Sequence, residues 1–111
     1  MVEFEHINHP THTIIALKGE VDLYGVGDLK KELMKYIEEN KDSINSLAID
    51  MSQLKYMDSS GIALMANLQK KVKAQGGKFY LLAVNEDIMN VLRLSALDSF
   101  FNIHESADAL P

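Results

Sequence analysis

The chain has 111 residues, no cysteine and a formal net charge of −5 at pH 7. This length corresponds to a single domain, on a usual range of roughly 100–200 residues per domain. Hydrophobic residues make up 47% of the chain and charged residues 24%, a balance typical of globular proteins rather than of disordered or fibrous ones. The absence of cysteine excludes a disulfide framework and a thiolate metal site.

Charge and hydropathy exclude further classes of function. Arg93 is the only arginine, and acidic residues outnumber basic ones 16 to 11, so a broad basic surface for nucleic acid is not expected. No apolar run approaches the roughly 18 residues of a membrane span. The chain also begins with acids where a secretory signal carries positive charge. We therefore expect a cytoplasmic protein that binds neither nucleic acid nor membranes.

Two strands joined by a short turn are predicted first. Phe4–Ile7 is a short strand candidate, and the β-branched segment Thr11–Lys18 is a second one. Between them, Pro10 fixes a turn because its ring restricts φ. A connection this short favours an antiparallel hairpin. The segment Gly19–Asp22 is expected to end the second strand.

Two amphipathic helices are predicted next, with the short buried strand Leu47–Ile49 between them. Apolar residues recur at helical spacing at Val26, Leu29, Leu33 and Ile37, and again at Ile62, Met65, Leu68 and Val72. The glycine pair Gly76-Gly77 ends the second helix, because glycine is the residue favoured just beyond a helix C-terminus.

The remaining elements continue the alternation. A strand is predicted at Phe79–Val84, a helix beginning at Asn85 and a last short strand at Phe100–Ile103, followed by at most a helical turn at Ser106–Leu110. Strands and helices that alternate in this way are typical of an α/β layer fold. We expect a mixed sheet of four or five strands packed with helices.

The most informative segment follows the strand Leu47–Ile49. Asp58, Ser59 and Ser60 are all residues favoured at helix N-caps, and they open the second long helix. A helix N-terminus presents free N–H groups and about half a positive charge, which suits an anion such as a phosphate on a serine. Capping alone is the simplest interpretation of this pattern. A phosphorylated serine is the functional alternative.

Several segments resemble the anti-sigma factor antagonist family, the single-domain STAS proteins. The resemblance rests on Asp58-Ser59-Ser60-Gly61 followed by apolar residues, on Gly19-Glu20-Val21-Asp22, on Gly76-Gly77 before a strand, and on residues 92–97 and 101–106. It covers nearly the whole chain in order and length. The resemblance implies that residues 1–111 form one STAS domain with the mixed α/β fold expected above.

The family resemblance implies a regulatory switch and not an enzyme. Such proteins bind an anti-sigma factor, which is also a serine kinase of the histidine-kinase-like ATPase type, and this binding releases a sigma factor. The kinase phosphorylates the first serine of the motif, which ends binding, and a PP2C-type phosphatase resets it. The resemblance implies these two partners, no cofactor and no metal. We expect a monomer.

The resemblance assigns roles to particular residues. Ser59 corresponds to the phosphorylated serine, Asp58 precedes it in both, and Asp22 corresponds to an aspartate near that serine. Ser60 and Gly61 complete the motif. From its position alone we also expect Met57 to face a partner, because it is a flexible apolar residue beside the switch serine.

Two residues depart from the family pattern. Ala63 and Ala96 stand where many members of the family have glycine. Both alanines are small, so helix packing is expected to survive, but the precise specificity for a partner is left open.

Other chemistries are less well supported by the sequence. His6, His9 and His12 are spaced by three, but Pro10 excludes a helix there and strand positions three apart face opposite sides, so no metal site is expected. Asp50 ends a buried strand as a receiver-domain phosphoacceptor does, but the acidic pair that holds Mg²⁺ in receivers is missing.

A hydrolase and a different STAS pathway remain as alternatives. A hydrolase would use Ser59 or Ser60 as its nucleophile, but the Gly-x-Ser-x-Gly elbow is absent and only His104 could approach as a base, through folding. The second alternative is a STAS-type interaction module in another pathway, such as a stressosome-like scaffold or a transport accessory.

Overall fold

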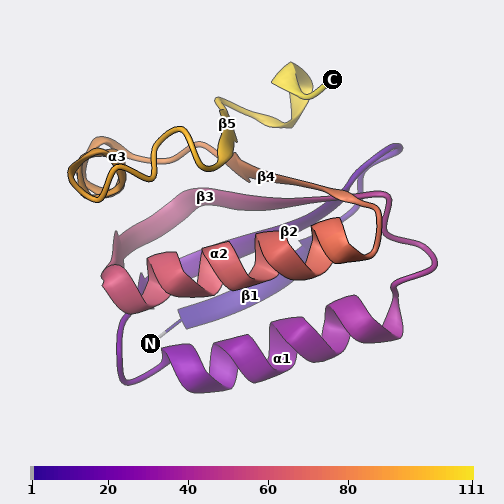
Figure 1. The fold of residues 1–111 in the computed structure, drawn as a ribbon, viewed down its shortest axis with the longest axis horizontal. Coiled ribbons are helices and arrows are strands. Elements are labelled where there is room, and N and C mark those ends of the chain that lie inside the picture. The colour runs from indigo at the N-terminus through magenta and orange to yellow at the C-terminus, as the bar shows by residue number, and fades with distance from the viewer. Residues whose placement is uncertain (1) are drawn as a thin grey trace.

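A five-stranded mixed sheet lies at the centre of the computed structural model, which describes residues 2–111 (Figure 1). The strands are β1 (Val2–Ile7), β2 (Thr13–Val21), β3 (Ser46–Met57), β4 (Lys78–Leu82) and β5 (Asn102–His104), and they lie in the sheet in this same order. β1 pairs antiparallel with β2, and the other three pairings are parallel. The predicted hairpin and mixed sheet are confirmed.

Helices connect the parallel strands. They are α1 (Val26–Glu39), α2 (Ser59–Ala74) and α3 (Glu86–Leu94), and a short 3-10 turn at Ala107–Ala109 follows β5. α1 and α2 run side by side along one face of the sheet (Figure 1). The described residues include no helix that is both long and apolar enough to span a membrane.

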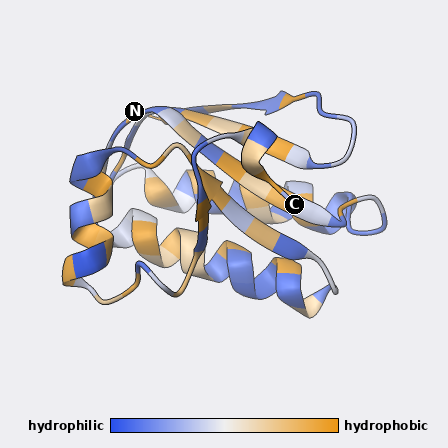
Figure 2. Ribbon diagram, turned by 90° about the horizontal axis from the view of Figure 1, so that it is seen from above, coloured by the Kyte–Doolittle hydropathy of each residue, from blue (hydrophilic) through white to orange (hydrophobic). Residues whose placement is uncertain are grey.

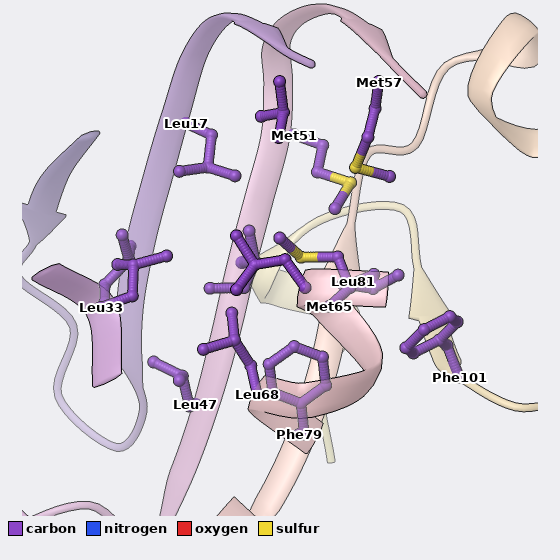
Figure 3. Packing of buried hydrophobic residues seen from close by; sticks show 14 of the residues in the cluster. Leu17, Leu33, Leu47, Met51, Met57, Met65, Leu68, Phe79, Leu81 and Phe101 are labelled. Atoms are coloured by element: carbon purple, nitrogen blue, oxygen red, sulfur yellow. The ribbon is translucent and has the colours of Figure 1, made fainter. Parts of the chain in front are cut away.

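The main core lies between the sheet and the helices. It joins fully buried side chains from α1, α2 and the central strands, including Leu33, Leu47, Met65, Leu68 and Phe79 (Figure 3). The apolar stripes that predicted the two long helices supply this layer, while their hydrophilic residues face outward (Figure 2). The helix periodicity therefore identified the core-facing residues correctly.

A smaller apolar cluster covers the opposite face of the sheet. Ile14, Ala48, Tyr80 and Leu82 are buried there, and Ala107 and Leu110 of the C-terminal segment pack against them. The segment after β5, for which at most a helical turn was expected, thus covers part of this second face.

The strands differ from the predicted ones mainly at their ends. β2 begins at Thr13 because the loop before it folds around His9, whose Nδ1 accepts the backbone N–H groups of Thr11 (3.3 Å) and His12 (3.2 Å). β3 is much longer than Leu47–Ile49 and ends at Met57. Its second half is largely exposed, so no apolar run identified it.

The extension of β3 positions the segment of interest. Beyond Asp50, β3 no longer pairs with β4 but continues to pair with β2, through irregular register between Ala16 and Lys18 and between Gly19 and Glu20. Bulges of this kind increase the twist of a strand pair and re-aim its end. The two strands reach their last paired residues together, and α1 and α2 begin shortly after.

Candidate functional site

The two aspartates of interest follow neighbouring strand ends. Val21 and Met57 are register partners in the parallel pair β2–β3, so Asp22 and Asp58 leave the sheet side by side. The backbone N–H of Asp58 donates to the carbonyl oxygen of Val21 at 3.2 Å. The parallel pairing therefore brings together two segments that are more than 30 positions apart in the sequence.

Asp58 caps α2 and also holds the neighbouring loop. Its Oδ1 accepts the backbone N–H groups of Ser60 (2.9 Å) and Gly61 (3.3 Å) and the hydroxyl of Ser60. Its Oδ2 accepts the backbone N–H of Leu23 at 3.2 Å. The hydroxyl of Ser60, with these N–H groups, holds the pKa of the Asp58 carboxyl below its ordinary value, against a smaller opposing effect of burial. The predicted capping of α2 by this motif is confirmed, and of the three candidate residues Asp58 is the cap.

The two serines of the motif differ in their surroundings. Ser60 is half-buried, and its hydroxyl donates to the carboxylate of Asp58. Ser59 is the first residue of α2 and is exposed. A modifying enzyme can therefore reach Ser59 without disturbing the cap, whereas Ser60 contributes its hydroxyl to the cap itself.

Gly61 and Met57 form a close packing contact below the serines. A Cβ built on Gly61 would lie 2.3 Å from the Cγ of Met57 and 2.9 Å from the Cγ1 of Val21, so no larger residue fits there without movement. Met57 is only 2% exposed and points into the core (Figure 3). The expectation that Met57 faces a partner was wrong: the first turn of α2 covers its side chain.

The loop between β2 and α1 is fixed by Asp22. The Oδ1 atom of Asp22 accepts the backbone N–H groups of Tyr24 (3.0 Å) and Gly25 (3.1 Å). The backbone carbonyl oxygen of Asp22 accepts the N–H of Val26 at 2.9 Å. Because Asp58 accepts the N–H of Leu23, each backbone N–H from Leu23 to Val26 has a partner. Asp22 thus organises the loop that lies beside the start of α2.

Sequence reasoning missed the large apolar residues around this site. Leu23 is 71% exposed and Tyr24 is 95% exposed, and both project from the loop after β2. Tyr56, at the end of β3, is 52% exposed. Leu23 and Tyr24 precede a glycine in a segment that was expected to leave a strand. Two large apolar residues in such a loop could have indicated an exposed apolar surface.

The other candidate sites do not gather at this end of the sheet. Asp50 accepts the N–H of Ser52 at 2.8 Å within β3, and the His104 ring lies against Tyr80, with ring centroids 5.5 Å apart. Within residues 2–111, no group of three or more His, Asp or Glu side chains is arranged to hold a metal ion.

The three N-terminal histidines have separate surroundings. His6 lies near the ring of Tyr36, with centroids 6.1 Å apart, while His9 accepts the loop N–H groups described above. His12 is half-buried and hydrogen-bonded to Ser46. Two of the three histidines, His9 and His12, thus stabilise the loop before β2.

The comparison with protein families agrees with this geometry. The profile of the STAS domain matches residues 3–110. The chain belongs to the STAS domain family. The curated relatives include an anti-sigma-B factor antagonist of Staphylococcus epidermidis, 23% identical over 107 residues, with 96% of each chain covered. Another, from Bacillus subtilis, is 27% identical over 94 residues, covering 85% of this chain and 83% of the relative.

Solved structures share the fold of this STAS domain. An anti-sigma factor antagonist from Mycobacterium paratuberculosis superimposes with a TM-score of 0.82 at 21% identity, covering 97% of this chain and 89% of that one. The phosphorylated form of the Bacillus cell fate determinant SpoIIAA gives 0.70 at 20% identity, with 96% and 94% covered. The murine anion transporter Slc26a9 gives 0.75 at 14% identity over 86% of this chain and 16% of the transporter.

The two alanines that depart from the family pattern occupy different environments in this STAS domain. Ala63 is exposed on α2. Ala96 has a positive φ of 58° just beyond α3. Its N–H donates to the carbonyl oxygen of Arg93 at 3.0 Å, and the N–H of Leu97 donates to the carbonyl oxygen of Leu92 at 2.8 Å. These two bonds form a Schellman motif, in which glycine is favoured at the left-handed position. The backbone conformation at residue 96 therefore favours glycine, whereas the helical conformation at residue 63 does not.

Proposed function

We propose that this STAS domain is an anti-sigma factor antagonist: it binds a serine-kinase anti-sigma factor, releases a sigma factor, and is switched off by phosphorylation of Ser59. The names of its relatives support the antagonist role. The site supports the choice of residue, because the start of α2 is the place where the family motif, an exposed serine and a helix N-terminus coincide.

The observation that carries the proposal is the contrast between the two serines. Ser59 is exposed, whereas the hydroxyl of Ser60 donates to Asp58. A kinase needs an accessible hydroxyl that does not have to give up a hydrogen bond within the protein before it reacts. Ser59 fits this requirement, and Ser60 does not.

Phosphorylation of Ser59 would act on the partner and not on the fold. A phosphate adds about −1.5 to −2 charges and three acceptor oxygens. At a helix N-terminus such a charge is favoured by roughly 0.3–1 kcal/mol, so the domain should stay folded. Asp58 already accepts the N–H groups of Ser60 and Gly61, so the phosphate remains on the surface.

The bulk of an added phosphate is costly for a partner that fits closely around the carboxylates of the site. Asp22 and Asp58 leave adjacent strand ends, and Glu20 lies in the same segment. A partner surface that accommodates this negative charge would meet a bulky dianion after phosphorylation. A loss of about 2.7 kcal/mol in binding free energy weakens binding roughly a hundredfold, which is enough for a switch.

The proposed partners follow from this role. They are a kinase-type anti-sigma factor of the histidine-kinase-like ATPase class and a PP2C-type phosphatase that removes the phosphate. We propose that the domain acts as a monomer in the cytoplasm and that it has no catalytic activity of its own. In this proposal the domain acts by binding and releasing its partner, and it does not itself carry out the reaction at Ser59.

A STAS-type module in another pathway is the competing proposal. The match to the anion transporter Slc26a9 favours it, because the same fold occurs there as a small part of a much longer chain. A stressosome-like scaffold or a transport accessory would use the same fold without a kinase that acts on Ser59.

Phosphate mapping distinguishes these proposals. The protein is incubated with candidate kinase-type anti-sigma factors and ATP, and phosphate is located by mass spectrometry in wild type, Ser59→Ala and Ser60→Ala. Phosphate on Ser59 that is lost only in Ser59→Ala supports the antagonist. Phosphate confined to other residues refutes the site, and no phosphate with any candidate favours the competing proposal.

A further inference from the structure

We propose that Leu23 and Tyr24 are the apolar anchor by which this domain binds its partner, which presents an apolar pocket bordered by basic residues. This inference rests on the proposed function and adds the part of the surface that supplies the binding energy. It concerns Leu23 and Tyr24, two residues to which neither the family motif nor the comparisons assign a role.

The exposure of the two side chains is the first observation. Tyr24 is 95% exposed and Leu23 is 71% exposed, and they are adjacent in the chain. Single exposed apolar residues are normal, but two large ones in succession on a surface loop form a candidate interaction surface. Tyrosine is also among the residues most often found at the energetic centre of protein interfaces.

The loop that carries the two residues is held rigidly, which is the second observation. The N–H of Leu23 donates to Asp58 Oδ2 (3.2 Å), and that of Tyr24 donates to Asp22 Oδ1 (3.0 Å). The next two N–H groups also bind Asp22. A loop fixed before binding loses little further backbone entropy on association. The fold thus presents two exposed apolar side chains on a pre-organised support.

The position of the loop connects it to the switch. Asp58, which accepts the N–H of Leu23, directly precedes Ser59. The loop that carries Leu23 and Tyr24 therefore lies beside the residue that precedes Ser59, and a partner that covers this loop reaches the start of α2. The bulk of a phosphate placed there would keep the two surfaces apart, and this steric effect would outweigh the attraction between its charge and basic residues of the partner.

Charge identifies the chemistry of the partner. Residues 1–55 contain ten acidic residues and six lysines, and Glu20, Asp22 and Asp28 flank the apolar pair along the chain. Oppositely charged groups around an apolar centre steer association and fix its orientation. The fitting surface is therefore an apolar pocket with arginine or lysine residues at its rim.

The test compares exposed apolar residues on two different segments, the loop after β2 and the last turn of α3. The affinity for the anti-sigma factor that phosphorylates Ser59 is measured by isothermal titration for wild type, Leu23→Ala, Tyr24→Ala and the control Leu94→Ala. Leu94 is 89% exposed at the end of α3, so its substitution matches the others in exposure. We expect Tyr24→Ala to weaken binding about tenfold or more and Leu94→Ala to change it less than twofold.

The outcomes separate this inference from the proposed function. Equal affinities for wild type, Leu23→Ala and Tyr24→Ala would overturn the anchor while leaving the antagonist role intact. If wild type binds none of the candidate anti-sigma factors, the proposed function is wrong and the anchor with it. Melting temperatures confirm folding, and Tyr24→Phe should keep most of the affinity because it retains the ring.

Discussion

The carboxylate of Asp58 joins two segments that the chain separates by more than 30 residues: one oxygen caps α2, and the other accepts the N–H of Leu23 at 3.2 Å. The cap and the loop before α1 therefore share a single side chain. This arrangement places a rigid apolar loop beside the exposed Ser59. It also makes Asp58 a residue whose loss should affect both folding and partner binding.

Removing the carboxylate should destabilise the domain. Asp58→Ala takes away the cap of α2 and the acceptor for Leu23, and loss of an N-cap costs about 0.5–2 kcal/mol. Urea unfolding measures the free energy of unfolding. Asp42→Ala, at an exposed aspartate between α1 and β3, is the control and should stay within about 0.5 kcal/mol of wild type. A similar loss in both variants would contradict the role of Asp58.

The contribution of Asp58 should depend on pH. Its pKa is lowered in the folded state from the ordinary value of 3.8, chiefly by the hydrogen bond from Ser60. A depressed folded-state pKa contributes stability that is fully present above the ordinary pKa and is lost as the pH falls through the folded one. The stability difference between wild type and Asp58→Asn, measured by urea unfolding, should shrink between pH 6 and pH 3. A constant difference would contradict this assignment.

Two glycines should respond oppositely to alanine. In Gly61→Ala the new Cβ would lie 2.3 Å from the Met57 side chain, and overpacking of this kind costs about 1–3 kcal/mol. Around Gly27, in the first turn of α1, no other described residue lies within 4 Å of the added Cβ, apart from the chain neighbours and the backbone of its own helix. Gly27→Ala should therefore stabilise the protein, by up to about 1 kcal/mol of helix propensity. Thermal unfolding of the two variants checks this, and destabilisation of both to the same degree would contradict it.

Two alanines should likewise respond oppositely to glycine. Ala96 has a φ of 58° in the Schellman motif after α3, a conformation that costs an L-residue roughly 1–2 kcal/mol. Glycine relieves this strain but makes the unfolded chain more flexible, so Ala96→Gly should gain roughly 0.5 kcal/mol. Ala63→Gly, in the interior of α2, should lose about 0.5–1 kcal/mol. Chemical unfolding measures the free energy of unfolding of both variants. An equal loss of stability in Ala96→Gly and Ala63→Gly would show that the backbone at residue 96 is not strained.

The sequence predicted the elements that local patterns encode. The 3.6-residue periodicity of α1 and α2 identified their buried faces, and Asn85 and Asp58 marked the starts of α3 and α2 correctly. Each of these signals lies within one or two turns of the chain. The order of elements then sufficed for the mixed sheet, because short connections favour antiparallel pairs and helical crossovers favour parallel ones.

The features that were missed depend on contacts distant in sequence. The second half of β3 pairs only with β2 and buries only Leu54 and Met57 among exposed residues, so it carries neither an apolar run nor a strict alternation. Met57 was expected at the surface from its position beside Ser59. Its burial depends on the close approach of Gly61 across the turn, which the local sequence does not reveal. The bond between Asp58 and Leu23 requires the register of two parallel strands, which no local motif specifies.

The central claim is that a phosphate on Ser59 releases the partner without unfolding the domain. The most direct measurement is the affinity for the anti-sigma factor of protein that is fully phosphorylated at Ser59, compared with unphosphorylated protein and with Ser59→Asp, each checked for folding by its melting temperature. We predict unchanged folding and an affinity about a hundredfold lower for the phosphorylated protein, with a loss in the same direction for Ser59→Asp. Equally tight binding by the folded, phosphorylated protein would contradict the account.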